Sequence, residues 1–492
     1  MMTDKSAHDD REHFEPRRSF VMDKLQADAS PSAEAEKRLP RRTLLQGAAA
    51  LAGLAAAGPF IWVPKTVRAQ TGATGSFKHL IYIRLSGGFR FPCAFNGDVG
   101  DQYNPFGLAS GVPSGVAWGV SKLLERAPFA SEGTMGNGLR PLHQLADRIT
   151  VMPTVDHEPL AGGADGNHDT GLERFLTGYV SGEAGVFTRI QMGLRAEYDE
   201  ALKEGKLKLP AFVMGSAGMA RGLGSFAPYR PPVLNGASFE RFTSSVGAMP
   251  DWIAKATTET DARSRDRRHP ALRERVDAYI QTRAATKQYS EIFTSQLLKV
   301  DDRSNEVVDG VSNDELRTLF GQSRASANIR LALRLFHYGC PAVYLDQGGY
   351  DMHSGEENGL PGAMEEPNRL LSALIHVLPR MEHPDGGTYW DHTVVVVGSE
   401  FSRTARGSRF NSARGSDHNA DNSTRWMSMP FFGGPIAGGR VVGATCRRDD
   451  LAAEGTVYSY RSVMNTLMDG LGCDPTAFFP ADPVVPDLLG TP

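Results

Sequence analysis

Four consecutive valines, Val394 to Val397, place the strongest constraint on how this chain can fold. A run of β-branched apolar residues without polar alternation cannot leave one face in water. It therefore predicts an interior strand of a parallel sheet that helices cover on both faces. Glu400 follows the run after a Gly-Ser pair. Because open α/β sheets bind ligands beyond the carboxyl ends of their strands, the valine run predicts that Glu400 lies in a functional crevice.

Two further apolar runs support a parallel sheet. His79 to Leu85 and Ala342 to Leu345 have the pattern of buried strands that end in glycine-containing loops, and helical patterns separate the runs along the chain. Repeated strand-helix units pair in parallel. We therefore expect an α/β fold with a doubly wound, mostly parallel sheet and helices on both faces. Apolar residues at helical spacing predict a helix-rich insertion at about 250–338.

Residues 1–69 differ in character from the rest of the chain. Arg41 and Arg42 directly precede a weakly apolar stretch rich in Ala and Gly, and the small-residue pattern of a signal peptidase site ends at Ala69. This segment resembles a twin-arginine export signal. It predicts a periplasmic or secreted protein whose folded domain is 70–492, with no stable membrane span after cleavage. An uncleaved anchor is the alternative, because about 17 to 25 apolar residues can cross a bilayer.

Composition and charge exclude several classes of partner. With 40% hydrophobic and 22% charged residues, the chain has the profile of a globular protein with a large core. Its formal net charge of −4 predicts neither nucleic acid nor an anionic membrane surface as a partner. The four cysteines lie far apart without a CxxC pair, so neither a zinc knuckle nor a disulfide framework is predicted.

Histidine and carboxylate residues gather in the loops that follow the predicted strands. Oxygen and nitrogen ligands together suit zinc, manganese or iron, whereas an all-oxygen set would suit magnesium or calcium. We therefore predict a divalent transition metal in a polar site at the carboxyl edge of the sheet. The predicted metal ligands are Asp351, His353, Glu400, Asp417 and His418.

Each of these ligands also has a plainer interpretation. Asp351 and His353 fall in a glycine-rich turn, and Asp417 and His418 fall in a polar loop. Either loop can simply be exposed to solvent. Glu400 would be a metal ligand or the orienting partner of one. Alternatively, it is a buried carboxylate whose charge is compensated by Arg403 or Arg90.

Three motifs resemble those of an exported bacterial family, domain of unknown function 1501 (DUF1501). The stretches GGYDMHSG, VVVVGSEFSRT and RGSDHN occur here in the order in which that family has Gly-Gly-Trp-Asp-Thr-His, Ser-Glu-Phe-Gly-Arg-Thr and Gly-Thr-Asp-His-Gly. The family resembles the alkaline phosphatase and sulfatase superfamily, which implies an alkaline phosphatase-like sheet with a metal-bearing cleft. That superfamily often has an Asp after its first strand, where this chain has Phe89 and Arg90. An arginine cannot ligate a metal, which argues against a complete two-metal centre.

The resemblance also implies a catalytic role for the start of one helix. In the sulfatase branch a Cys or Ser nucleophile lies ten residues before the glycine of a Leu-Leu-Thr-Gly ending, and the same count back from Gly178 gives His168. A helix N-terminus favours an oxyanion. An imidazole there suits metal ligation better than nucleophilic attack, and the nearest hydroxyl belongs to Thr170. His168 and Thr170 are therefore the predicted catalytic residues, with metal-activated water and no covalent intermediate.

Two functions follow from these motifs. The first is a metal-dependent hydrolase that takes a small anionic phosphate or sulfate ester as its substrate. The alternative is a non-catalytic periplasmic binding or assembly protein that keeps a vestigial site, because a fold does not fix a function. Hydrolysis of an ester by the protein would favour the first function, and its absence would favour the second.

Overall fold

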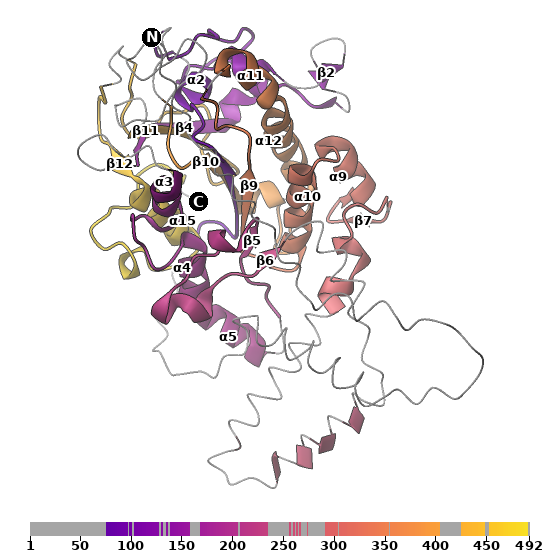
Figure 1. Ribbon diagram of the computed structural model, residues 1–492. Coiled ribbons are helices and arrows are strands. Elements are labelled where there is room, and N and C mark those ends of the chain that lie inside the picture. The colour runs from indigo at the N-terminus through magenta and orange to yellow at the C-terminus, as the bar shows by residue number, and fades with distance from the viewer. Residues whose placement is uncertain are drawn as a thin grey trace, which may run out of the picture. The chain divides into compact units, whose positions relative to one another are not determined.

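The centre of the protein is a mixed sheet of eight strands in the order β12, β4, β11, β10, β1, β9, β5, β6 (Figure 1). β11 runs antiparallel to its neighbours β10 and β4, whereas the other neighbouring strands are parallel. The predicted mostly parallel α/β sheet is therefore confirmed. The strands are β1 His79–Leu85, β4 Ile149–Asp156, β5 Phe212–Met214, β6 Val233–Leu234, β9 Ala342–Gln347, β10 Thr393–Gly398, β11 Trp426–Phe432 and β12 Tyr458–Ser459.

The structure is a computed structural model of the chain. It describes residues 75–490 except 97, 101–102, 127–128, 131–133, 136–137, 158–167, 205–206, 235–254, 257–258, 261, 264, 267–272, 274–290, 304, 354, 404–424 and 448–451. These residues belong to the second of the chain's two units, Ala55–Pro492. The predicted export signal, Asp417, His418 and much of the predicted helical insertion lie outside the described residues.

Helices cover both faces of the sheet, with α10 and α12 on one side and α3, α4 and α15 on the other (Figure 1). Side chains of β1 contact both layers, because His79 stacks on Phe336 of α10 and Tyr82 on Phe175 of α3. Among the described helices, none is both long enough and apolar enough to cross a bilayer. The helices are α2 Pro92–Phe95, α3 His168–Thr177, α4 Val186–Gly193, α5 Arg195–Lys203, α9 Asn313–Phe320, α10 Arg324–His337, α11 Glu356–Ala363, α12 Glu365–Val377, α13 Tyr389–His392 and α15 Tyr460–Gly470.

The interior of the sheet is apolar, as the valine run predicts. Val394 to Val397 form most of β10 and are each 0% exposed, and every residue of β1 is buried. The four cysteines are buried and unpaired. Two-sided burial explains why these strands lack the alternation of a half-exposed strand.

The register of the three central strands aligns their carboxyl ends. Arg84 of β1 lies opposite Gly398 of β10 and opposite Asp346 of β9. The loops after these strands therefore leave the sheet at one level. This alignment places residues 86–88, 348–353 and 399–403 at the same edge.

Candidate functional site

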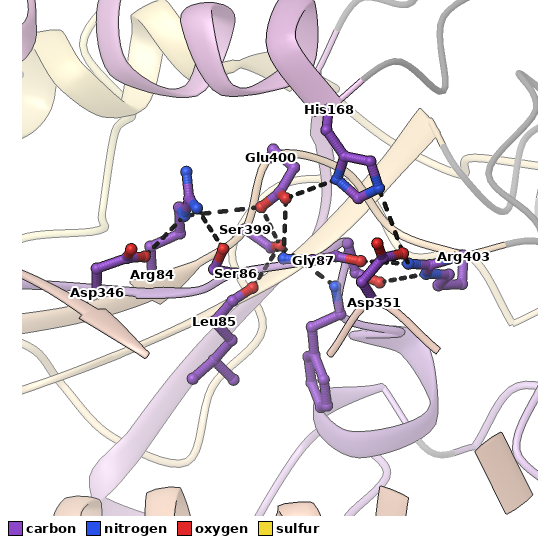
Figure 2. Close-up of polar contacts among 12 residues, drawn as sticks. Arg84, Leu85, Ser86, Gly87, His168, Asp346, Asp351, Ser399, Glu400 and Arg403 are labelled. Atoms are coloured by element: carbon purple, nitrogen blue, oxygen red, sulfur yellow. Dashed lines mark hydrogen bonds and ion pairs between the residues drawn. The ribbon is translucent and has the colours of Figure 1, made fainter. Parts of the chain in front are cut away.

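Glu400 follows β10 and is buried at the carboxyl edge of the sheet, with 2% of its surface exposed. The backbone N–H of Gly87 donates to Oε1 at 2.8 Å, and the Ser399 hydroxyl lies 2.9 Å from Oε2. Figure 2 shows these contacts around the carboxylate. The end of β10 and the turn after β1 thus fix the orientation of Glu400.

The turn after β1 depends on two glycines. Gly87 has φ +119°, and a Cβ there would lie 2.3 Å from the backbone nitrogen of Asp351. Gly88 has φ +75°, and its Cβ would lie 2.1 Å from the ring of Phe401. Only glycine adopts such angles readily and leaves this space. The tight turn brings the loops after β1, β9 and β10 into direct contact.

His168 is the first residue of α3, and its ring lies beside Glu400. Its Nδ1 is 3.1 Å from Oε1 of Glu400. Because an ionised carboxylate only accepts hydrogen bonds, Nδ1 carries the proton and donates it. α3 packs closely on the segment after β10, since a Cβ at Gly171 would lie 2.9 Å from the ring of Phe401. This close packing sets the position of His168 over Glu400.

The contact between these two side chains changes the pKa of both. The hydrogen bond to Glu400 raises the pKa of His168, although partial burial opposes the shift. Burial alone would raise the pKa of Glu400, but the hydrogen bond with His168 and the charge of Arg84 hold it below its ordinary value. Glu400 is therefore a buried, ionised carboxylate at neutral pH.

Asp351 and His353 complete a cluster with His168. Nε2 of His168 lies 3.3 Å from Oδ1 of Asp351, and Nε2 of His353 lies 2.9 Å from the same oxygen. One ligand atom from each residue falls within 4.8 Å of the others. The side chains of Asp351 and His353 are 51% and 52% exposed, so the cluster opens to solvent.

Arg403 is fully buried beneath this cluster. Its Nε donates to the carbonyl oxygen of Gly88 at 2.9 Å, and its guanidinium also contacts the carbonyl of Gly87 and the carboxylate of Asp351. Burial is the largest single influence on the pKa of Asp351 and raises it, but the hydrogen bond and the charge of Arg403, together with the two histidines, lower the pKa overall. Arg403 thus holds both the glycine turn and Asp351 in place.

The two arginines expected as alternative partners of Glu400 make other ion pairs. Arg403 pairs with Asp351, and Arg90 pairs with Glu356 at 2.6 Å. Among the described arginines and lysines, Arg84 is the one that pairs with Glu400, and its Nε is 3.8 Å from Oε2. The structure therefore does not support the expected pairing of Glu400 with Arg403 or Arg90.

Sequence reasoning missed Arg84 and its second partner, Asp346. Nε of Arg84 lies 3.0 Å from Oδ1 of Asp346, and its guanidinium donates to the hydroxyl of Ser86. Burial raises the pKa of Asp346 despite the nearby arginine. The sequence contains a feature that could have predicted this pairing. Arg84 is a single arginine in the apolar strand HLIYIRL, and a buried arginine needs a partner.

The spacing of the cluster fits one metal ion. Two ligand atoms about 2.1 Å from a tetrahedral metal lie about 3.4 Å apart. The distances of 3.3 and 2.9 Å to Asp351 approach that value, and two imidazoles with one carboxylate are a known donor set for zinc and iron. Of the predicted site residues, His168, Asp351, His353 and Glu400 converge, and Thr170 lies in the first turn of α3.

The sequence of residues 121–482 matches the family described as "Protein of unknown function (DUF1501)". The match spans more than half of the chain. The chain belongs to the DUF1501 family. The resemblance inferred from the three motifs is thereby confirmed. No curated protein matches this DUF1501 chain.

Several solved structures resemble this DUF1501 protein at low identity. The C-terminal periplasmic domain of EptC from Escherichia coli has 10% identity and a TM-score of 0.32, over 87% of this chain and 92% of that one. The lipoteichoic acid synthase LtaP from Listeria monocytogenes has 11% identity and a TM-score of 0.33, over 87% and 78%. A Vibrio parahaemolyticus protein in the alkaline phosphatase superfamily has 10% identity and a TM-score of 0.31, over 82% and 68%. TM-scores below 0.5 carry no activity over to this chain.

Proposed function

We propose that this DUF1501 protein is an exported metal-dependent enzyme that acts on phosphate or sulfate esters. The observation that carries the proposal is the cluster of His168, Asp351 and His353, with Glu400 bonded to the far side of the His168 ring. His168 and His353 would each offer Nε2, and Asp351 an oxygen. Three protein ligands leave a coordination position for water or substrate, as in catalytic zinc sites.

Glu400 acts in this proposal as the orienting partner of His168. Its oxygens already face the N–H of Gly87, the Nδ1–H of His168, the hydroxyl of Ser399 and the charge of Arg84. Three of these contacts are hydrogen bonds of 2.8 to 3.1 Å, which engage the carboxylate within the protein. Because Glu400 accepts a hydrogen bond from Nδ1–H of His168, the lone pair of Nε2 is directed at Asp351. This is the usual arrangement behind a metal-bound histidine.

Several features of the site favour an anionic ester. His168 stands at the N-terminus of α3, where backbone N–H groups and the helix dipole attract negative charge. Half-exposed ligands give a substrate access to the site. A bound divalent metal would polarise an ester oxygen and lower the pKa of a water molecule. The motif resemblance to the alkaline phosphatase and sulfatase superfamily supports the same class of substrate.

Water is the proposed nucleophile. His168 occupies the position that the motif count gives to the nucleophile, and its ring is engaged by Glu400 on one side and Asp351 on the other. Thr170 offers a hydroxyl in the first turn of α3, and a threonine nucleophile would need a neighbouring base to activate it. Hydrolysis would therefore proceed without a covalent enzyme intermediate, and generic aryl esters should turn over slowly.

Binding of a tetrahedral oxyanion tests the site independently of the leaving group. Sulfate, phosphate and vanadate should raise the melting temperature of zinc- or manganese-loaded protein, because a ligand that binds only the folded state stabilises it. They should have little effect on metal-free protein or on a His168→Ala variant. Equal stabilisation of loaded and metal-free protein would contradict a metal-dependent site.

Turnover tests the enzymatic part of the proposal. The loaded protein is assayed against aryl and alkyl phosphate monoesters, phosphate diesters and sulfate esters, with a Thr170→Ala variant alongside. We expect hydrolysis of at least one ester class, with Thr170→Ala retaining it. Oxyanion binding with no turnover of any class would favour the non-catalytic binding protein. A phosphorylated or sulfated Thr170 found by mass spectrometry would overturn attack by water.

A further inference from the structure

Arg84 is a buried cation that lies between the carboxylates of Asp346 and Glu400 (Figure 2). Its side chain is 5% exposed, and its Nε lies 3.0 Å from Asp346 and 3.8 Å from Glu400. Neither Nε nor Nη1 makes a hydrogen bond of acceptable geometry to a described residue. Nη2 donates to the hydroxyl of Ser86, and two carboxylates lie near the rest of the guanidinium. The main contribution of Arg84 to the site is therefore its positive charge.

Among the residues that the structure describes, the charges of the site favour one divalent cation. With both histidines neutral, the three carboxylates exceed the two guanidinium groups by one negative charge. One divalent metal would bring the site to one positive charge, which suits an anionic ester, whereas two would bring it to three. The charged residues are Glu400, Asp346, Asp351, Arg84 and Arg403.

We propose that Arg84 is a positioning residue that takes the place of a second metal ion, so that the site holds a single metal. The inference rests on the proposed metal site. Arg84 stands between Glu400 and Asp346, and an arginine neither ligates a metal nor loses its proton in a protein. A second divalent ion near these carboxylates would meet a fixed positive charge in a buried environment, where screening is weak.

Arg84 acts on the metal through Glu400 and His168. Its Nε lies 3.8 Å from Oε2 of Glu400, while Oε1 of the same carboxylate accepts a hydrogen bond from Nδ1 of His168. Without that neighbouring cation, the buried carboxylate of Glu400 would turn toward solvent. His168 would then lose the partner that aligns Nε2 with Asp351. Loss of a residue that supports a metal ligand in this way typically weakens metal binding by about 10- to 100-fold.

Metal stoichiometry and affinity test this role with three variants. Wild-type protein should bind one zinc per chain. Arg84→Met should bind zinc at least about tenfold more weakly, and Arg84→Lys, which keeps the charge, should recover most of that loss. Arg90→Met is the matched control, because Arg90 is also 5% exposed and pairs with a buried carboxylate, Glu356. It should lower the melting temperature without weakening zinc binding.

Spectroscopy separates this role from a general loss of stability. The visible spectrum of bound Co²⁺ should change in Arg84→Met and be unchanged in Arg90→Met. Two zinc ions per wild-type chain, equal zinc affinity in wild type and Arg84→Met, or equal weakening by Arg84→Met and Arg90→Met would each overturn the proposal.

The positioning role of Arg84 can also be tested in metal-free protein, and this test does not require that the protein binds a metal. In wild type and Arg84→Lys, ¹⁵N-histidine spectra should show His168 protonated at Nδ1 and hydrogen bonded, with the signal assigned by its loss in His168→Gln. Arg84→Met should lose this signature. An unchanged signature in Arg84→Met would overturn the role of Arg84, whereas absence of metal from wild type with an altered signature would overturn only the metal site.

Discussion

Oε1 of Glu400 lies 3.1 Å from Nδ1 of His168, although the two residues are 232 positions apart in the chain. This hydrogen bond joins the end of the central strand β10 to the first residue of α3. It fixes the imidazole with its second nitrogen facing Asp351. The valine strand delivers a carboxylate to the edge of the sheet, and that carboxylate orients a histidine.

A Glu400→Gln variant tests the orienting contact. The amide keeps one oxygen for Gly87 and His168, but its NH₂ group replaces the oxygen nearest to the positive charge of Arg84. We expect zinc affinity to fall by about 10- to 100-fold, as measured by titration calorimetry. A Glu356→Gln variant, which disturbs a buried pair outside the cluster, should keep zinc affinity. Unchanged affinity in Glu400→Gln would contradict the orienting role.

The glycine turn after β1 should tolerate no side chain. In Gly87→Ala, the new Cβ would lie 2.3 Å from the backbone of Asp351 at a φ of +119°. We expect the free energy of unfolding to fall by about 1 to 3 kcal/mol or more in urea denaturation, together with metal content. Gly111→Ala is the control, because Gly111 has φ +71° but nothing within 4 Å of its Cβ. Equal losses in both variants would show that the contact with Asp351 is unimportant.

Acid should destabilise the protein through the buried His79. Its Nδ1 donates to the carbonyl of Cys340 at 2.8 Å and its Nε2 accepts from His383 at 3.1 Å, so the neutral ring is fully engaged. Burial lowers the pKa of His79 from 6.5 to about 3. Between these values the unfolded chain binds a proton that the folded chain excludes. The contribution of His79 to the free energy of unfolding is therefore complete above pH 6.5 and is lost as the pH falls toward 3.

The contribution of His79 can be isolated by substitution. His79→Asn keeps a donor for Cys340 but cannot titrate. Urea denaturation from pH 4 to 7 should show a slope of unfolding free energy against pH that is smaller than in wild type by up to about 1.4 kcal/mol per pH unit. Identical slopes in the two proteins would refute this assignment.

Export should depend on the arginine pair in the N-terminal segment. Changing Arg41 and Arg42 to Lys keeps the charge but removes the feature on which the twin-arginine resemblance rests. Cell fractionation should find the double variant in the cytoplasm and the wild type in the periplasm or medium. A variant with Lys37 and Arg38 changed to Gln should still be exported. Normal export of the double variant would contradict the prediction that export depends on Arg41 and Arg42.

The sequence predicts the parts of this fold that depend on local pattern. The valine run predicts a two-sided buried strand, and its polar end predicts that Glu400 lies at the carboxyl edge of the sheet. The resemblance places His168 at the start of a helix, and α3 begins there. Each of these inferences needs only periodicity or a short motif.

The pairing of charges could not be predicted in the same way. Arg84 meets Asp346 and Glu400 because the register of β1 with β9 and β10 brings together residues that are far apart in the sequence. The partner of Glu400 was expected among arginines in nearby loops, but those pair elsewhere. Register and packing are long-range properties that a single sequence pattern does not specify. Asp417 and His418 remain predicted ligands, outside the described residues.

Anomalous diffraction from metal-loaded crystals would show whether a metal ion binds at the cluster of His168, Asp351 and His353. Data are collected on both sides of the zinc, manganese and iron absorption edges. We predict one peak per chain, about 2.0 to 2.2 Å from Nε2 of His168, Nε2 of His353 and an oxygen of Asp351, and no peak in crystals of His168→Ala. The absence of a peak at these atoms in fully loaded wild-type crystals, or a single peak elsewhere in the protein, would contradict it.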